Sequence, residues 1–231
     1  METNRFNPQS NRTNSILTGI FFIVAAISSI VGLKLYDPIL VDPYFIETGS
    51  QHSSQIVWGA INELILSATA TGTALMMYPY LKRYNESLGM GYLSFRMLEV
   101  VFILIGIVSV LTALSVSQHY INHTIDKANA TALGLAFIAL HNWTFMLGPN
   151  FMLAINTFLY SYTFRHAELV PKALSLLGMT AACLIMVAAI LEMFGIIEQV
   201  SVWGALLALP IALYEMTLAV WLIVKGFRIE S

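Results

Sequence analysis

The chain contains long apolar stretches that carry almost no charge. The residues from 131 to 161 include no Asp, Glu, Lys or Arg. Because a bilayer core needs about 20 mainly apolar residues per helix, each such stretch is a candidate membrane span. Six stretches qualify, namely residues 15–33, 56–78, 93–115, part of 131–161, 173–194 and 202–224. The sequence therefore predicts an all-α, polytopic membrane bundle of six transmembrane helices.

Composition excludes most other classes of protein. Of the 231 residues, 58% are apolar and 10% are charged, whereas soluble domains carry about 25% charged residues. The formal net charge of −2 provides no basic field for nucleic acid. The single cysteine, Cys183, excludes a disulfide framework and a site built from several thiolates. We expect a lipid bilayer as the main partner and no nucleic acid.

Two local features refine this prediction. The fourth stretch is too long for one straight span and contains Gly148 and Pro149, so we expect a kinked fourth helix. The loop after the first helix, about residues 34–55, contains two Asp-Pro pairs that mark turns. Its apolar and aromatic residues predict an ordered outer loop that folds over the rim of the bundle.

Basic residues predict the orientation of the helices. Nine basic residues fall on the side that holds both termini, and only Lys34 and Lys127 fall on the other. The excess of Lys and Arg marks the cytoplasmic side, so we expect both termini in the cytoplasm. The predicted parts are a cytoplasmic tail at 1–14, a transmembrane domain at 15–225 and a cytoplasmic tail at 226–231.

Few ionisable residues lie inside the predicted spans. Each charge at bilayer depth costs about 2.5–3.5 kcal/mol on insertion scales, so these side chains are expected to face the bundle interior. Glu192 falls within a turn of an outer helix end and is interpreted as solvated. The remaining candidates for ligand binding or proton relay are Glu63, His141, Glu215, Arg96 and Glu99.

Helix geometry supports these candidates. Glu63 shares a stripe with the small residues Gly59, Ser67 and Ala70, and Glu215 lies on a similar face. Arg96 and Glu99 are three residues apart and can pair on one face. With a rise of 1.5 Å per residue, Glu99 and Glu215 lie roughly 9 and 13 Å from the cytoplasmic edge, and Glu63 lies roughly 10 Å from the outer edge.

The depth of the candidates bears on their chemistry. His141 is expected between the membrane centre and the outer third, so the candidates are staggered across the bilayer. A buried carboxyl group without a fixed cation favours its protonated form and can then carry a proton. Secondary candidates are Tyr92, Asn142 and Pro149.

Several common chemical signatures do not occur. The chain has no His-Glu-x-x-His motif, no phosphate-binding glycine loop and no Glu-x-x-His pair of the kind found in di-iron bundles. We therefore predict no metal and no cofactor.

An ordered set of short motifs resembles a known family. The set runs from Leu35-Tyr36-Asp37-Pro38, through the segment from Gly91 to Glu99 and His141 with Pro149, to the segment from Trp221 to Phe227. Together these motifs resemble the bacterial membrane proteins catalogued as domain of unknown function 4386. The resemblance implies a multi-pass bacterial membrane protein, which we expect in the cell's inner membrane, and brings no reaction, ligand or catalytic residue.

Three functions remain open from the sequence. The first is transport or binding, in which the buried carboxylates and His141 hold a small or lipophilic ligand or relay protons. The second is an intramembrane enzyme in which a protonated glutamate is the general acid for an isoprenoid or lipid-like substrate. The third is an accessory subunit whose acids only fix helix packing. A homo-oligomer would supply further helices and is compatible with all three.

Overall fold

The computed structural model describes residues 8–198 and 201–228, and within these ranges the protein is helical and contains no strand. Arg5 and the outermost residues of both predicted tails, 1–7 and 229–231, lie outside the described residues. The long elements are α1 (Pro8–Leu35), α4 (Ser53–Tyr84), α5 (Glu86–Ile121), α6 (Lys127–Phe145), α7 (Leu153–His166), α8 (Lys172–Met193) and α9 (Val202–Val224). A π-helical turn, η2 (Met146–Met152), joins α6 to α7.

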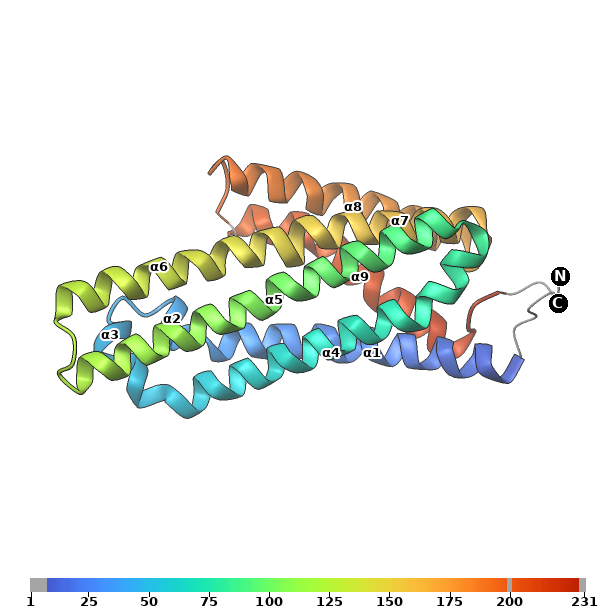
Figure 1. Ribbon diagram of the computed structural model, residues 1–231. Helices are drawn as coiled ribbons and strands as arrows, with labels where there is room; N and C mark the ends of the chain where they lie inside the picture. The colour runs from blue at the N-terminus through green and yellow to red at the C-terminus, as the bar shows by residue number, and fades with distance from the viewer. Residues whose placement is uncertain (1–7, 199–200, 229–231) are drawn as a thin grey trace.

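The long helices form a closed ring. α1 packs against α4 and α9, α4 packs against α5, and α5 packs against both α6 and α7. α8 then lies between α7 and α9 and completes the ring. α1 begins and α9 ends at the same end of the bundle (Figure 1), where Arg12 donates a hydrogen bond of 2.6 Å to the carbonyl of Ile223. We call this end of the bundle the terminal end.

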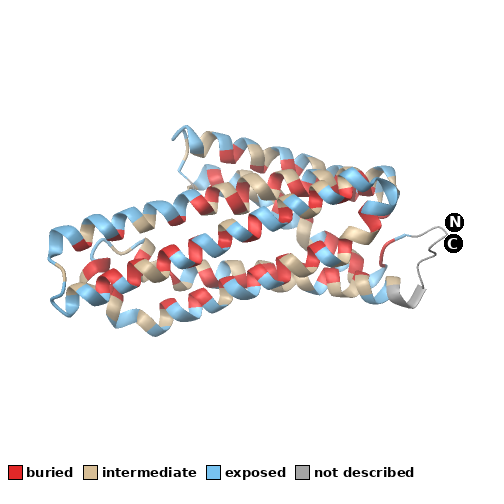
Figure 2. Cartoon of the chain, viewed as in Figure 1, coloured by how far each residue is buried: buried red, intermediate tan, exposed pale blue. Residues whose placement is uncertain are grey.

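The helices differ in length, and this divides the core in two. α8 and α9 have 22 and 23 residues and are about 33–35 Å long, close to the thickness of a bilayer core. The run from Lys127 to His166 has 40 residues and is about 60 Å long. One hydrophobic cluster lies where α7, α8 and α9 pack against α1, α4 and the start of α5, and a second lies among α1, α4, α5, α6 and the segment between α1 and α4. Buried residues face inward along both halves (Figure 2).

Five helical stretches are long and apolar enough to cross a membrane, namely 11–35, 86–121, 127–166, 172–193 and 202–224. The membrane character of the chain is therefore confirmed. The remaining predicted span, the second at 56–78, corresponds to α4, in which Asn62, Glu63 and a run of hydroxyl side chains reduce the mean hydropathy. A crossing by α4, and with it the count of six, stays a prediction.

The hydroxyl groups of α4 are satisfied within the helix. Ser67 donates to the carbonyl of Glu63, Thr71 donates to that of Ser67, and Thr73 donates to that of Ala70, at 2.7–3.0 Å. Hydroxyl groups bonded in this way place few unpaired donors in an apolar environment. The polar composition of α4 is therefore compatible with its place between α1 and α5.

The segment between α1 and α4 folds into short helices, α2 (Asp37–Leu40), α3 (Phe45–Thr48) and the 3-10 turn η1 (Gly49–His52). Ser117 of α5 fixes this segment, because its hydroxyl donates to the carbonyl of Ile46 at 2.9 Å and accepts from the backbone N–H of Ser50 at 3.0 Å. Phe45 and Ile46 are buried against α6. The segment therefore covers the end of the bundle opposite the terminal end (Figure 1).

The fourth predicted span contains the π-helical turn at the Gly148-Pro149 dipeptide. Proline lacks an N–H and its ring crowds the carbonyl group one turn earlier, which explains a local change of helical pitch at this point. The predicted kink of this helix stays a prediction.

Candidate functional site

The candidate residues fall into two separate groups. Arg96, Glu99 and Glu215 lie together, and we call them, with the polar side chains around them, the arginine cluster. Glu63 and His141 line a different site, which we call the histidine cavity. On α5, Glu99 belongs to the arginine cluster and Gly106 lines the histidine cavity. The two residues are seven positions apart, which is about 10 Å along the helix axis. The three residues Glu63, His141 and Glu215 therefore do not share one cavity.

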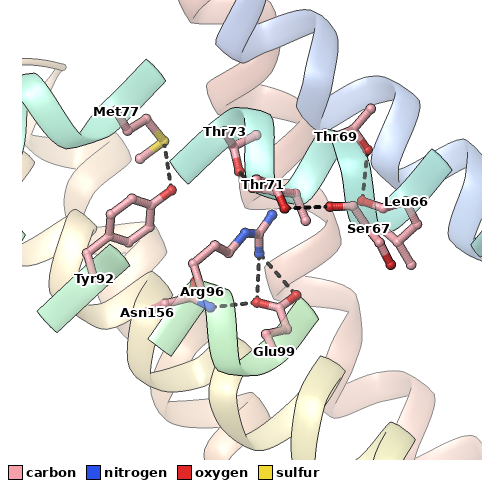
Figure 3. Close-up of polar contacts among 11 residues, drawn as sticks. Leu66, Ser67, Thr69, Thr71, Thr73, Met77, Tyr92, Arg96, Glu99 and Asn156 are labelled. Atoms are coloured by element: carbon pink, nitrogen blue, oxygen red, sulfur yellow. Dashed lines mark hydrogen bonds and ion pairs between the residues drawn. The ribbon is translucent and has the colours of Figure 1, made fainter. Parts of the chain in front are cut away.

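The arginine cluster is centred on an ion pair. Nη1 of Arg96 lies 3.1 Å from Oε1 and 2.9 Å from Oε2 of Glu99, and both side chains are almost fully buried. Asn156 of α7 donates a further hydrogen bond of 2.6 Å to Oε2 of Glu99. Figure 3 shows Arg96 and Asn156 reaching the carboxylate from two helices. The spacing on α5 predicts the pair, and α7 provides the third member.

Tyrosine side chains surround this pair. The hydroxyl group of Tyr92 lies 3.5 Å from Sδ of Met77 (Figure 3). The rings of Tyr92 and Tyr160 meet edge to face at 5.6 Å, and those of Tyr160 and Tyr214 stack at 6.0 Å. The hydroxyl of Tyr214 is hydrogen-bonded to Ser161 at 2.8 Å. Buried tyrosines supply apolar bulk together with a polar group that needs a partner.

Glu215 of α9 completes the cluster. Its carboxyl group interacts electrostatically with both Arg96 and Glu99. One guanidinium group therefore faces two carboxyl groups, and they come from different helices. A second cation is not among the side chains that interact with Glu215 in the described part of the chain.

Many polar atoms of the arginine cluster have no protein partner. Within the described residues, eight buried side-chain nitrogen or oxygen atoms make no hydrogen bond, and five of them lie here. These five are Nε of Arg96, Oδ1 of Asn156, Oγ1 of Thr157, the hydroxyl of Tyr160 and Oε1 of Glu215; the hydroxyls of Thr157 and Tyr160 lie close enough to interact with each other, which leaves the atoms of Arg96, Asn156 and Glu215 as the clearest cases. Each buried group of this kind costs about 1–3 kcal/mol when it stays unpaired. Such a concentration is typical of a site that receives water or a polar ligand.

The histidine cavity is narrow and lies between α4, α5, α6 and η2. Glu63, His141, Tyr36 and Pro149 contribute to its walls, and Gly106 of α5 makes room beside the imidazole. The cavity volume is about 10 Å³, which leaves room for about one water molecule. Its chemistry combines a carboxyl group, an imidazole and a phenol.

Close packing fixes the two titratable groups of this cavity. A Cβ atom at Gly32 of α1 would lie 2.7 Å from Oε1 of Glu63, so this glycine makes the place for the carboxyl group. The rings of His141 and Tyr36 meet edge to face at 6.0 Å, and the Tyr36 hydroxyl is buried without a partner. Nδ1 of His141 lies 3.3 Å from Oδ1 of the exposed Asn142.

Glu192 is interpreted from the sequence as a solvated residue, whereas in the structure it has a protein partner. Its Oε2 accepts a hydrogen bond of 2.9 Å from Asn150 of η2, and its side chain is half-buried. This contact ties α8 to the π-helical turn. Among the described residues, no three His, Cys, Asp or Glu side chains are grouped as a metal site would require.

Sequence reasoning missed uncharged polar members of both sites, namely Tyr36, Asn156, Thr157, Tyr160 and Tyr214, and it also missed Asn150, the partner of Glu192. The available signal was weak. Asn150, Asn156 and Thr157 are polar residues in a stretch without charge, so desolvation alone makes them candidates for interhelical contacts.

These features define the class of protein, which is a helical membrane protein with a polar interior. The chain belongs to the family described as Domain of unknown function (DUF4386), whose model matches residues 17–226. No curated protein and no solved structure matches the chain. The resemblance inferred from short motifs is therefore confirmed at the level of the family.

Proposed function

We propose that this protein crosses the bacterial inner membrane six times, with both termini in the cytoplasm, and that its polar interior binds a small or lipophilic ligand or relays protons. Two observations support the six crossings. α4 occupies a full place in the ring between α1 and α5, and α1 begins where α9 ends (Figure 1), as an even number of crossings requires.

The distribution of paired lysines supports the orientation. At the end opposite the terminal end, Lys34 forms an ion pair with Asp37, and Lys127 forms one with Glu47. That end therefore carries little uncompensated positive charge. The terminal end holds Arg12, Arg83, Lys225 and Arg228, and an excess of basic residues marks the cytoplasmic side.

The observation that carries the functional proposal is the group of polar atoms without a hydrogen-bond partner around the Arg96–Glu99 ion pair, above all Nε of Arg96, Oδ1 of Asn156 and Oε1 of Glu215. A purely structural ion pair in a bundle interior is stable when every lone pair and proton has a partner. Here donors and acceptors from α5, α7 and α9 converge and satisfy one another only in part. These polar atoms are suited to a polar ligand, a water molecule or a proton that binds and dissociates.

The charges of the arginine cluster favour a proton as one of its guests. Arg96 can neutralise one carboxylate, whereas Glu99 and Glu215 both interact with it. An uncompensated charge in a low-dielectric interior is costly, so neutrality is reached when one of the two carboxyl groups is protonated. Glu99 holds the Asn156 hydrogen bond as well, and Glu215 is therefore the group we assign to the exchangeable proton.

In this proposal the histidine cavity is a second site that can hold a proton; each of the two proton-holding sites is called a station. Glu63 and His141 are both titratable, and the cavity that they line lies about 10 Å along α5 from Glu99. A span of this length needs a few bridging waters or one small ligand between the stations. The two sites together would give a polar route through part of the membrane, with Glu215 at one station and Glu63 at the other.

Proton flux in liposomes tests the proposal. The purified protein is reconstituted with a pH-sensitive dye inside the vesicles, and a potassium diffusion potential drives protons. We expect protein-dependent flux, reduced at least tenfold by Glu215→Gln or Glu63→Gln, variants that keep shape and remove ionisation. Glu86→Gln, at an exposed residue of α5, is the matched control and should leave the flux unchanged.

Infrared spectroscopy separates binding from a structural role. A protonated carboxyl group has its own carbonyl absorption, and we expect Glu215→Gln to remove one such band while Glu86→Gln does not. If the wild-type protein gives no flux above empty vesicles, and neither buried glutamate contributes a band that titrates, the acids only fix helix packing and the proposal is wrong.

A further inference from the structure

A large pocket opens at the terminal end of the bundle, away from both sites described above. Its volume is about 800 Å³. Its walls come from the end of α4, from the turn between α7 and α8, and from the segment that follows α9. We call it the basic pocket, because Arg83, His166, Lys225 and Arg228 line it.

The pocket has a net positive charge. The acid among its lining residues is Glu168, which forms an ion pair of 2.9 Å with Lys172. Hydrogen bonding and charge from Lys172 hold the pKa of Glu168 below its ordinary value, so this carboxylate stays ionised and is compensated from outside the lining. Its strongest interaction is with Lys172, and its weaker attraction to Arg228 leaves Lys225 as a cation that Glu168 does not compensate.

The negative ends of the helix dipoles do not fully neutralise the positive side chains of the pocket. α4, α7 and α9 all end at this pocket, and each C-terminus carries about −0.5 elementary charge. The three ends therefore contribute about −1.5, whereas Lys225 and Arg228 alone contribute two full positive charges. The surplus is available to an anion.

The wall formed by the segment after α9 is fixed in place. Gly226 adopts a φ of +77°, which L-residues with a side chain rarely adopt. The backbone N–H of Phe227 donates to Ser15 at 3.1 Å, and that of Arg228 donates to the carbonyl of Leu169 at 2.9 Å. The Arg228 guanidinium lies 5.4 Å from the centre of the Trp221 ring. This backbone therefore presents Lys225 and Arg228 to the pocket in a preorganised arrangement.

We propose that the basic pocket binds a phosphate-bearing anion, either the headgroup of an anionic phospholipid or a free phosphate compound. Guanidinium and ammonium groups are the donors that phosphate oxygens prefer. The rings of Tyr80 and Phe227 form an apolar wall, 4.3 Å apart between their centres, beside which glycerol or acyl carbons can pack. Basic pockets between helices at the cytoplasmic side are typical lipid-headgroup sites.

The binding experiment uses the full chain in a neutral detergent. Native mass spectrometry measures retention of phosphatidylglycerol and of phosphatidylcholine, and isothermal titration with inorganic phosphate measures binding of the free anion. The test variants are Lys225→Gln, Arg228→Gln and the double variant. Arg228→Lys keeps the charge and controls for loss of packing on Trp221. Lys82→Gln is the matched control, since Lys82 lies at the same end of the bundle, pairs with Glu86 and does not line the pocket.

The expected result is a selective loss of anion binding. Each removed charge should weaken phosphatidylglycerol retention about fivefold and the double variant about 25-fold, with Arg228→Lys and Lys82→Gln close to wild type. Retention of phosphatidylglycerol that inorganic phosphate does not displace identifies a lipid headgroup. Saturable binding of inorganic phosphate that depends on Lys225 identifies a soluble phosphate compound. The proposal is overturned if the two lipids are retained equally and phosphate does not bind, or if Lys82→Gln weakens binding as much as Lys225→Gln.

Discussion

The carboxamide of Asn156 on α7 donates a hydrogen bond of 2.6 Å to the same oxygen of Glu99 that Arg96 contacts at 2.9 Å. The bond links α7 to α5 at the centre of the arginine cluster. It also occupies an acceptor site of a buried carboxylate that would otherwise be costly to desolvate. Helix packing and the chemistry of the cluster are thus joined at one contact.

Loss of this contact should destabilise the protein. Hydrogen bonds to charged groups contribute about 1.5–3 kcal/mol, so Asn156→Leu should lower the melting temperature in detergent by roughly 5 °C. Asn62→Leu is the matched control, because Asn62 donates only to the carbonyl of Trp58 in its own helix. Equal losses in the two variants would show that the bond between α5 and α7 adds nothing beyond a local contact.

The ion pair itself should show strong coupling. Arg96→Met leaves Glu99 and Glu215 without their cation, and Glu99→Leu leaves Arg96 with fewer acceptors, so each single variant should lose about 3–5 kcal/mol. The double variant should lose clearly less than the sum, because neither charge is then left unpaired on α5. A double-mutant cycle on unfolding in mixed micelles measures this coupling. Additive losses would contradict a buried, interacting pair.

Much of the helical framework could be predicted from the sequence. The last apolar stretch, 202–224, coincides with α9, since an apolar run in which Glu215 is the one charged residue, bounded by Ser201 and Lys225, leaves few alternatives. Depth along the helices also separated Glu99 and Glu215 from Glu63. The structure groups these residues in the same way, because positions at equal depth on neighbouring helices can meet whereas those 10 Å apart cannot.

The partners of these residues could not be predicted. Asn156 and Tyr36 carry no charge, so their burial cost does not distinguish them from other polar residues of the spans. Which side chain reaches Glu99 depends on the rotation of α7 about its axis, and that rotation is set by packing along the whole helix. Glu192 was misjudged for a related reason, because the π-helical turn that carries Asn150 brings an amide to it.

Gly134 should be required for docking of the segment between α1 and α4. A Cβ atom there would lie 2.4 Å from the ring of Phe45, which is buried and cannot move freely. Gly134→Ala should therefore cost about 1–3 kcal/mol and increase hydrogen exchange across residues 36–52. Gly91→Ala is the control, because its Cβ atom would meet one side chain at an ordinary 3.4 Å. Unchanged exchange in Gly134→Ala would show that Phe45 has room to shift.

The docking of this segment should also depend on pH. Glu47 of α3 forms an ion pair of 2.6 Å with Lys127 at the start of α6, and hydrogen bonding to Lys127 holds the pKa of Glu47 below its ordinary value of 4.5. The carboxylate of Asp42 accepts from Thr48 and from the backbone of Tyr44, which lowers its pKa as well. A lowered pKa means that the stabilisation is fully present above the ordinary value and is lost as the pH falls below it.

We therefore expect exchange protection of residues 36–52, corrected for the intrinsic rate, to be constant from pH 7 to pH 5 and to fall between pH 4.5 and pH 3. Glu47→Gln removes the charge that Lys127 contacts, so at pH 7 it should lose part of the protection that the wild type loses only in acid. Lys127→Gln should have the same effect, and the double variant should be no worse than either, because the two residues act as a pair. The contact would be irrelevant to docking if the wild type kept its protection at pH 3, or if Glu47→Gln and Lys127→Gln differed in their pH dependence.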